Sequence, residues 1–124
     1  MTGFDMTQTP HPERLKKRWE FQRGYRKGQK YWNREFVIYV HHNAFNSTRL
    51  GITASKKIGN SVRRNRTKRL IREVFRLSKE RIRTGYDIIV VGRTPSIHLD
   101  YQRAQKALLY LFRKARILEK SGNI

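Results

Sequence analysis

The stretch from Lys56 to Arg76 has apolar and polar positions that repeat at the spacing of an α-helix. At about 100° per residue, its apolar residues gather on one side: Val62, Leu70, Val74 and Leu77, with Ile71 and Phe75 at the edge. The opposite side carries polar residues at i, i+3, i+4, i+7 and i+11, which are Asn65, Lys68, Arg69, Arg72 and Arg76. The pattern predicts a helix with one packed stripe and one cationic stripe, which is suited to binding a row of phosphates.

Positive charge dominates this stretch, because nine Lys and Arg residues surround a single acid, Glu73. A solvated helix face usually mixes both signs, since like charges at i,i+4 repel each other. A disordered basic tail would lack the apolar stripe. The density of cations on an ordered helix therefore indicates a polyanionic partner.

The N-terminal half predicts one helix and two strands. Glu13–Lys27 is typical of a helix that ends at Gly28, with apolar or aromatic material at Leu15, Trp19, Phe21 and Tyr25. The β-branched and aromatic run Phe36–Val40 predicts a strand. An Asn- and Ser-containing turn over His42–Thr48 follows. Arg49–Ser55 then alternates in polarity, which predicts a second strand with one buried face.

The C-terminal half continues with two helices and a strand. Asn60 is a suitable N-cap for the basic helix, which we expect to run to about Arg83 and to end at Gly85. Asp87–Val91 is an apolar strand. Asp100 then caps a last helix, whose apolar residues at helical spacing are Ala104, Ala107, Leu108, Leu111, Phe112 and Ala115.

The expected order is α-β-β-α-β-α, with an additional strand around Tyr31–Tyr39. This order predicts an α/β sandwich, in which helices cover at least one face of a small mixed sheet. A length of 124 residues fits one domain. We place that domain at residues 13–118, between flexible tails at 1–12 and 119–124.

The charge of the chain narrows the classes of partner. The formal net charge is +20, which makes a small domain self-repulsive unless a polyanion accompanies it. Nucleic acid is the main expectation and a membrane surface the weaker one. The longest apolar runs, Phe36–Val40 and Ile88–Val91, are too short to cross a bilayer, and the first residues lack an apolar signal sequence. We therefore expect a cytoplasmic protein.

The sequence offers no set of residues for catalysis or metal binding. Cysteine is absent, which excludes thiolate chemistry and Cys-based zinc sites. The acids are scattered, and Glu73 has an ion-pair partner in Arg69 or Arg76. His41 and His42 are neighbours on a strand end and point to opposite faces, which does not suit a two-ligand metal site. No catalytic and no metal-binding residues are expected, so the protein alone should not break bonds.

Aromatic residues near cations supply a second candidate surface. Phe21 and Tyr25 stand at i, i+4 beside Arg18, Arg23, Arg26 and Lys27, and Tyr39 lies in the first predicted strand. Aromatic faces among cations can stack the bases of single-stranded nucleic acid. Core packing would produce the same spacing, so the pattern alone leaves both interpretations open.

The motifs of the basic stretch resemble a known family. Ser55–Val62 (SKKIGNSV), Arg64-Asn65-Arg66 and Lys68–Arg72 (KRLIR) together resemble the RNR signature of the bacterial ribonuclease P protein subunit. The resemblance extends over residues 14–118. It includes Arg14–Lys17, the helix around Phe21, Phe36–Tyr39, Arg49–Gly51 and Tyr86–Ile89.

The resemblance implies a fold similar to the second domain of a small-subunit ribosomal protein, with a left-handed β-α-β crossover. It also implies an endoribonuclease in which this chain, one copy per RNA, pairs with a catalytic RNA and helps to remove the 5′ leader of precursor tRNA. The RNA would carry the catalysis and would hold the Mg²⁺ ions of the holoenzyme. This agrees with the absence of catalytic residues in the sequence.

Site residues follow from the same resemblance. The catalytic RNA would be bound by Lys56, Lys57, Arg64, Asn65, Arg66, Lys68, Arg69, Arg72 and Arg76. The leader of precursor tRNA would lie in a cleft with Phe21, Tyr25 and Tyr39. The alternatives are a structural rRNA-binding protein of similar fold, which would need no aromatic cleft, and a non-specific DNA-compacting protein.

Gly24 departs from the family pattern, which usually has a bulky aliphatic residue, often Val, at this position of the first helix. Gly in a helix interior costs about 0.8–1 kcal/mol relative to Ala. From the sequence we therefore expect Gly24→Val to stabilise the protein by filling a vacant site.

Overall fold

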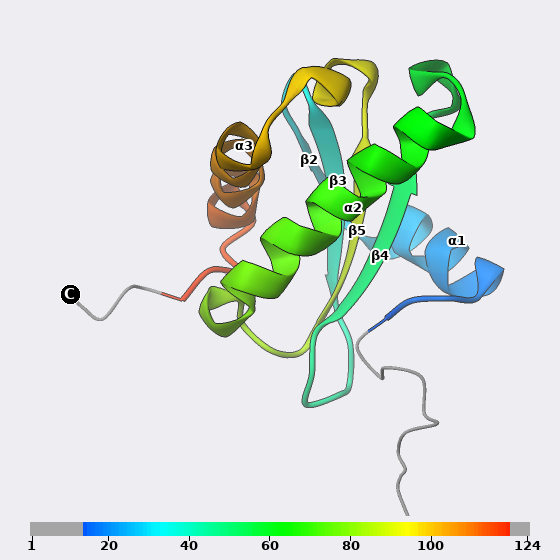
Figure 1. The fold of residues 1–124 in the computed structure, drawn as a ribbon. Helices are drawn as coiled ribbons and strands as arrows, with labels where there is room; N and C mark the ends of the chain where they lie inside the picture. Colours follow the sequence, from blue (N-terminus) through cyan, green and yellow to red (C-terminus); the bar gives the residue numbers. More distant parts are fainter. Residues whose placement is uncertain (1–13, 120–124) are drawn as a thin grey trace, which may run out of the picture.

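The computed structural model describes residues 14–119, so the predicted N-terminal tail and the residues after Glu119 lie outside the described part. One sheet has helices on both of its faces (Figure 1). The helices are α1 (Arg18–Lys27), α2 (Ser61–Ser78) and α3 (Tyr101–Lys114), with short 3₁₀ turns η1 (Lys56–Ile58), η2 (Lys79–Arg81) and η3 (Thr94–His98). The strands are β2 (Gln29–Trp32), β3 (Phe36–His42), β4 (Arg49–Ala54) and β5 (Tyr86–Gly92).

The sheet has the order β2-β3-β5-β4, with β3 antiparallel to both neighbours and β4 parallel to β5. The α/β prediction is confirmed, and β2 is the additional strand expected around Tyr31–Tyr39. In Figure 1, α2 crosses in front of the sheet between the upward-running strands β4 and β5, and β5 lies to the left of β4. The crossover is therefore left-handed, against the general right-handed rule.

The two faces of the sheet are covered unequally. α2 and α3 pack on one face over a continuous apolar core with Phe36, Ile38, Ile88, Val90 and Phe112 at its centre. On the other face, α1 packs against β3 and β5. Gly51, on the α1 face, and Leu50, on the core face, are both buried in β4. The prediction of a single buried face for β4 was therefore wrong.

The first helix is shorter at its N-terminal end than predicted. α1 begins at Arg18, and Arg14 instead forms a parallel bridge with Leu50 at the edge of β4. The amide of Leu15 donates to the carbonyl of Leu50 at 3.0 Å. This pairing holds the segment extended and buries Leu15, so the residue packs as expected but not in a helix.

The packed stripe of α2 differs from the predicted one. Val62 and Leu77 are exposed, and the buried residues are Thr67, Ile71, Val74, Phe75 and Ser78. The helix approaches β5 closely, because a Cβ at Gly92 would lie 2.5 Å from Thr67 Cγ2. Small polar residues fit such a close contact, and a count of apolar residues does not identify them. The buried stripe is consequently centred on Ile71 and Phe75, which the sequence pattern places at the edge.

The end of α2 also differs from the prediction. The helix stops at Ser78 and η2 follows, so the chain does not remain helical to Arg83. Ile82 is buried and pairs with Leu118 in an antiparallel bridge. Gly85 has a positive φ of 94° in the turn before β5, a conformation that favours glycine.

The space beside Gly24 is already filled. α1 is continuous through Gly24, which is buried over β5. A Cβ at this position would collide with Ile89 Cδ1 and lie 3.3 Å from Ile89 Cγ1. Ile89 is fully buried and so has little room to move aside. The stabilisation of Gly24→Val expected from the sequence is therefore not supported by the structure.

We now expect Gly24→Val to lower the melting temperature by several degrees, because overpacking costs about 1–3 kcal/mol. In an Ile89→Ala background the same change should raise it, since Val would fill the volume that Ile89 leaves. Thermal unfolding of the single variants and the double variant measures both effects. A higher melting temperature for the Gly24→Val single variant would show that Ile89 moves aside.

Candidate nucleic-acid interface

Three aromatic rings form a continuous group where α1 crosses the sheet. The Tyr25 and Tyr39 rings meet edge to face with centroids 4.9 Å apart, and the Phe21 ring lies 6.5 Å from Tyr25. The structure therefore brings together the three residues predicted for the leader cleft. Tyr25 is 41% exposed, whereas Phe21 and Tyr39 are half-buried.

The three rings are not equivalent. The Phe21 ring rests on Gly51 of β4, where a Cβ would lie 2.8 Å from two ring carbons. Phe21 thus packs on the sheet, and the absence of a side chain at Gly51 makes room for it. Burial, together with the neighbouring Tyr39, raises the pKa of the Tyr25 hydroxyl above its ordinary value of 10.0. Tyr25 is therefore neutral at physiological pH and offers an uncharged ring for stacking.

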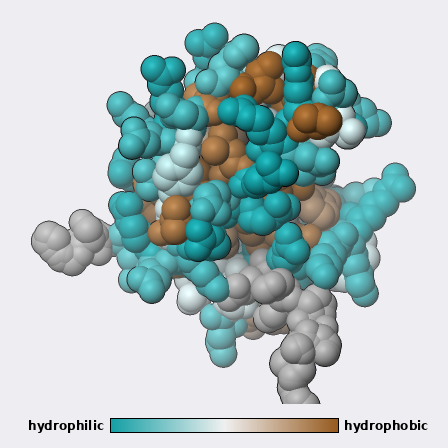
Figure 2. All heavy atoms as spheres, viewed as in Figure 1, coloured by the Kyte–Doolittle hydropathy of each residue, from teal (hydrophilic) through white to brown (hydrophobic). Residues whose placement is uncertain are grey.

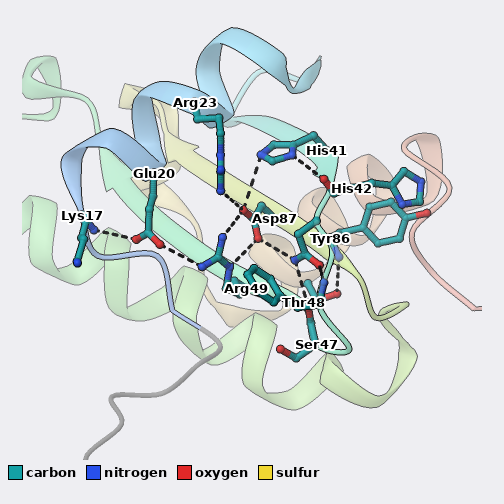
Figure 3. A network of polar contacts seen from close by, with 12 residues as sticks. Lys17, Glu20, Arg23, His41, His42, Ser47, Thr48, Arg49, Tyr86 and Asp87 are labelled. Carbon is teal, nitrogen blue, oxygen red and sulfur yellow. Dashed lines mark hydrogen bonds and ion pairs between the residues drawn. The ribbon is translucent and has the colours of Figure 1, made fainter.

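A buried ion network fixes α1 on the sheet (Figure 3). At its centre Asp87 in β5 accepts hydrogen bonds from Arg49 Nε at 2.8 Å, Arg49 Nη2 at 2.7 Å and Asn43 Nδ2 at 2.8 Å. Burial alone would raise the pKa of Asp87, but the hydrogen bonds from Arg49 and Asn43 outweigh it and hold the pKa below the ordinary value. Asp87 is therefore a charged carboxylate at neutral pH.

The network reaches α1 through Glu20. Arg49 Nη1 donates to Glu20 Oε2 at 3.0 Å, and Glu20 Oε1 accepts the amides of Lys16 and Lys17 at 2.9 Å each. Burial works to raise the pKa of Glu20, yet the two amides and Arg49 lower it overall. One carboxylate thus caps the start of α1 and also ties that helix to β4, next to Phe21.

The two histidines lie on opposite sides of the sheet, as predicted. His41 Nε2 is 3.7 Å from Asp87 Oδ2, on the α1 face. The His42 ring packs against Tyr86, with centroids 4.4 Å apart. Within residues 14–119, no group of three His, Cys, Asp or Glu residues is arranged to hold a metal ion.

The cationic residues predicted to bind RNA lie along η1 and α2. Asn60 caps α2 by accepting the amide of Arg63 at 3.0 Å, and Lys56 and Lys57 are exposed in η1 just before it. Asn65, Arg66, Arg69, Arg72 and Arg76 are exposed, and Arg64 and Lys68 are half-buried. Figure 2 shows hydrophilic side chains over most of this face, with separate small apolar patches. We call this surface the cationic face.

Two arginines of the cationic face have partners within the protein. Arg76 Nη2 pairs with Glu73 Oε2 at 2.6 Å, and Arg66 Nη1 donates to the carbonyl of Ile97 in η3 at 2.9 Å. Among the described residues, the other six cations of the face (Lys56, Lys57, Arg64, Lys68, Arg69 and Arg72) form no ion pair. Most of the face is thus available to an external anion.

The cationic face extends further than its motif indicates. Burial, with repulsion from Arg14 and Arg69, lowers the pKa of Arg72 below its ordinary value. Arg14 and Arg72 both line a hollow of about 530 Å³ between α2, β4 and the segment before α1. The lining residues are Arg14, Leu15, Lys16, Leu50, Ile52, Arg72, Phe75, Arg76 and Lys79. Arg14 and Lys16 are distant in sequence from the motif, so the sequence pattern could not place them there.

The aromatic group and the cationic face lie on opposite faces of the sheet, because α1 and α2 cover opposite sides. The protein therefore presents two separate surfaces of different chemistry. In the part of the chain that the structure describes, no helix is long and apolar enough to cross a membrane.

Comparison with known proteins identifies the class. A family model described as "Ribonuclease P" matches residues 9–116. A ribonuclease P protein component of Natranaerobius thermophilus is 42% identical over 107 residues, which are 86% of this chain and 93% of the relative. One of Bacillus pumilus is 44% identical over 108 residues, which are 86% and 91% of the two chains.

Solved structures agree with the sequence comparison. The RNase P protein of Staphylococcus aureus superposes with a TM-score of 0.79 at 41% identity, over 86% of this chain and 98% of that one. The RNase P protein of Thermotoga maritima gives a TM-score of 0.76 at 34% identity, over 82% and 96%. The fold and sequence are therefore those of a tRNA-processing protein. The chain belongs to the ribonuclease P protein family, whose members are protein components of a holoenzyme with an RNA subunit.

Proposed function

We propose that this chain binds the catalytic RNA of ribonuclease P through the cationic face and the 5′ leader of precursor tRNA beside the aromatic group. The observation that carries the proposal is the presence of two surfaces of different chemistry on opposite faces of one sheet. Unpaired arginines suit the phosphates of a folded RNA. Aromatic rings suit the unstacked bases of a single strand.

Catalysis is assigned to the RNA subunit in this proposal. The described residues lack a metal-binding cluster, and the ionised carboxylates of Glu20 and Asp87 are committed to Arg49. The Mg²⁺ ions of the holoenzyme would be held mainly by the RNA, where they would activate water and stabilise the leaving oxygen. The protein would act by positioning the precursor and by neutralising phosphates.

Reconstitution with the cognate RNA tests the proposal. The chain should restore cleavage of precursor tRNA at low magnesium concentration, and rigorously RNA-free protein should not cleave. Cleavage by the protein alone would overturn the assignment of catalysis to RNA. A failure to restore cleavage, with tight binding to ribosomal RNA, would favour a structural rRNA-binding protein without a substrate.

Recognition of the leader predicts a selective effect of the aromatic group. Tyr25→Ala should weaken binding of precursor tRNA to the holoenzyme by roughly 1–3 kcal/mol, the value of one base stack, and leave mature tRNA binding unchanged. Tyr110→Ala is a matched control, because Tyr110 is 47% exposed against 41% for Tyr25 and lies on α3, across the sheet. An equal loss of affinity for precursor and mature tRNA would show that Tyr25 has a structural role and does not contact the leader.

A further inference from the structure

A row of side chains crosses all four strands on the α1 face, next to the aromatic group. The strand register places Thr53, Val91, Val37 and Trp32 directly opposite one another in β4, β5, β3 and β2. The adjacent row contains Gly51, Ile89 and Tyr39, which lie under Phe21, Gly24 and Tyr25 of α1. Side chains of paired residues point to the same side of a sheet. The first row therefore forms a floor alongside the aromatic group.

This floor remains open along its length. Val37 and Val91 are only half-buried although β3 and β5 are the two central strands, and Thr53 is half-buried on the edge strand β4. The row ends at Trp32 on the edge strand β2, and Trp32 is 61% exposed. Its neighbour Tyr31 points to the opposite face and packs on the core. A large, mostly exposed indole is thus held on an edge strand at the end of this row.

We propose that Trp32 stacks a base of single-stranded RNA, which extends the leader-binding surface from the aromatic group of α1 across the sheet to its β2 edge. The inference rests on the proposed function in one respect, namely that the single strand is the leader of precursor tRNA. Tryptophan offers the largest ring for stacking. Every base has a π-face, so this contact would add affinity without a preference for sequence.

The charges around Trp32 favour nucleic acid over a protein partner. Lys30 Nζ lies 5.8 Å from the centre of the indole ring, and Arg34 is exposed in the next turn. Arg93 is exposed and donates from Nη1 to the carbonyl of Asn33 at 2.7 Å. Glu35 is the one acid in the sequence between Gln29 and His42. A phosphate backbone passing this edge would meet three cations beside one stacking ring.

The chain contains its own reporter and control. Trp19 and Trp32 are its two tryptophans. Trp19 is 52% exposed and has Arg23 5.0 Å from its ring, so its surroundings match those of Trp32. Trp19 stands two residues before Phe21, about 200° round the helix, and so lies on the side of α1 away from the aromatic group. Trp19→Phe leaves only Trp32 as a fluorophore, and Trp32→Phe leaves only Trp19.

A fluorescence titration of the two variants with a single-stranded oligouridylate at low salt tests direct stacking. The oligonucleotide should quench Trp32 in the Trp19→Phe variant and leave Trp19 in the Trp32→Phe variant little changed. A double-stranded RNA of equal charge should quench neither residue strongly. Equal quenching of both tryptophans, or none in the Trp19→Phe variant, would overturn the inference.

Precursor tRNAs with leaders of different length, bound to the reconstituted holoenzyme, test whether the RNA that contacts Trp32 is the leader. Trp32→Ala should lower affinity for precursor tRNA with a long leader roughly five- to hundred-fold. The loss should disappear once the leader is too short to reach β2, and Trp32→Phe should restore part of the affinity. Trp19→Ala should change neither the affinity for precursor tRNA nor its dependence on leader length. Active holoenzyme with no leader-dependent loss in Trp32→Ala would refute the Trp32 contact and leave the proposed function intact.

Discussion

The affinity of this protein for its RNA subunit should fall about 10³-fold between 50 and 200 mM salt. Six cations of the cationic face form no ion pair among the described residues, and each can displace one counterion from the RNA. A slope of about −0.9 per phosphate for duplexes then gives roughly −5 in a plot of log K against log salt. If Arg14, Lys16 and Arg66 also contact phosphates, the loss should approach 10⁵-fold.

Single variants of the cationic face test this account. Arg69→Ala should reduce the salt slope by about one, because Arg69 is exposed at the centre of the face. Arg113→Ala removes another exposed arginine, on α3, and should leave the slope unchanged. Affinity measured by filter binding at several salt concentrations gives both values. Identical slopes for the two variants would place the RNA interface elsewhere.

Local patterns predicted most of the elements. The boundaries of β3, β4, β5 and α3 were within a few residues of the structure, and the caps at Asn60 and Asp100 are present. These features depend on short-range alternation and on the side chain next to a helix start. The left-handed crossover followed only from family likeness, because sequence rules favour the opposite hand.

Features that depend on tertiary contacts were missed or wrong. The packed stripe of α2 was displaced because two polar residues, Thr67 and Ser78, are buried, and hydropathy does not report the close approach of Thr67 to Gly92 in β5. The space next to Gly24 is filled by Ile89, which lies 65 positions later in the chain. Trp32 could not be assigned to a face until the register of β2 was known.

The ion network was missed for a similar reason. Asp87 and Arg49 are 38 residues apart, and Arg49 and Glu20 are 29 apart. The acids of the sequence were interpreted as scattered, whereas folding brings two of them to a single arginine. One available signal was the presence of charged residues in otherwise apolar strands, at Arg49 at the start of β4 and at Asp87 in β5. A buried strand rarely carries a charge without a partner.

Asp87→Ala should destabilise the protein by about 3–5 kcal/mol, the usual cost of removing one partner from a buried ion pair. Asp87 is 1% exposed, and its loss would leave Arg49 with Glu20 as its remaining carboxylate. The melting temperature should fall by roughly 10–20 °C for a domain of this size. Glu73→Gln is the control, because the Glu73–Arg76 pair is exposed and its loss should change stability little.

The contribution of the charge of Asp87 can be separated from that of its packing by measuring how the free energy of unfolding of the wild type and an Asp87 variant depends on pH. Because the pKa of Asp87 is lowered on folding, its stabilisation is complete above the ordinary value of 3.8 and is lost as pH falls through the folded value. Chemical denaturation of the wild type and of Asp87→Asn, which keeps the shape, should therefore give curves that converge in acid. A constant difference from neutral pH to the acid limit would assign the effect to packing. In that case Asp87, Arg49 and Glu20 would not hold α1 by charge, and the positions of Phe21 and Tyr25 would depend on apolar packing against the sheet.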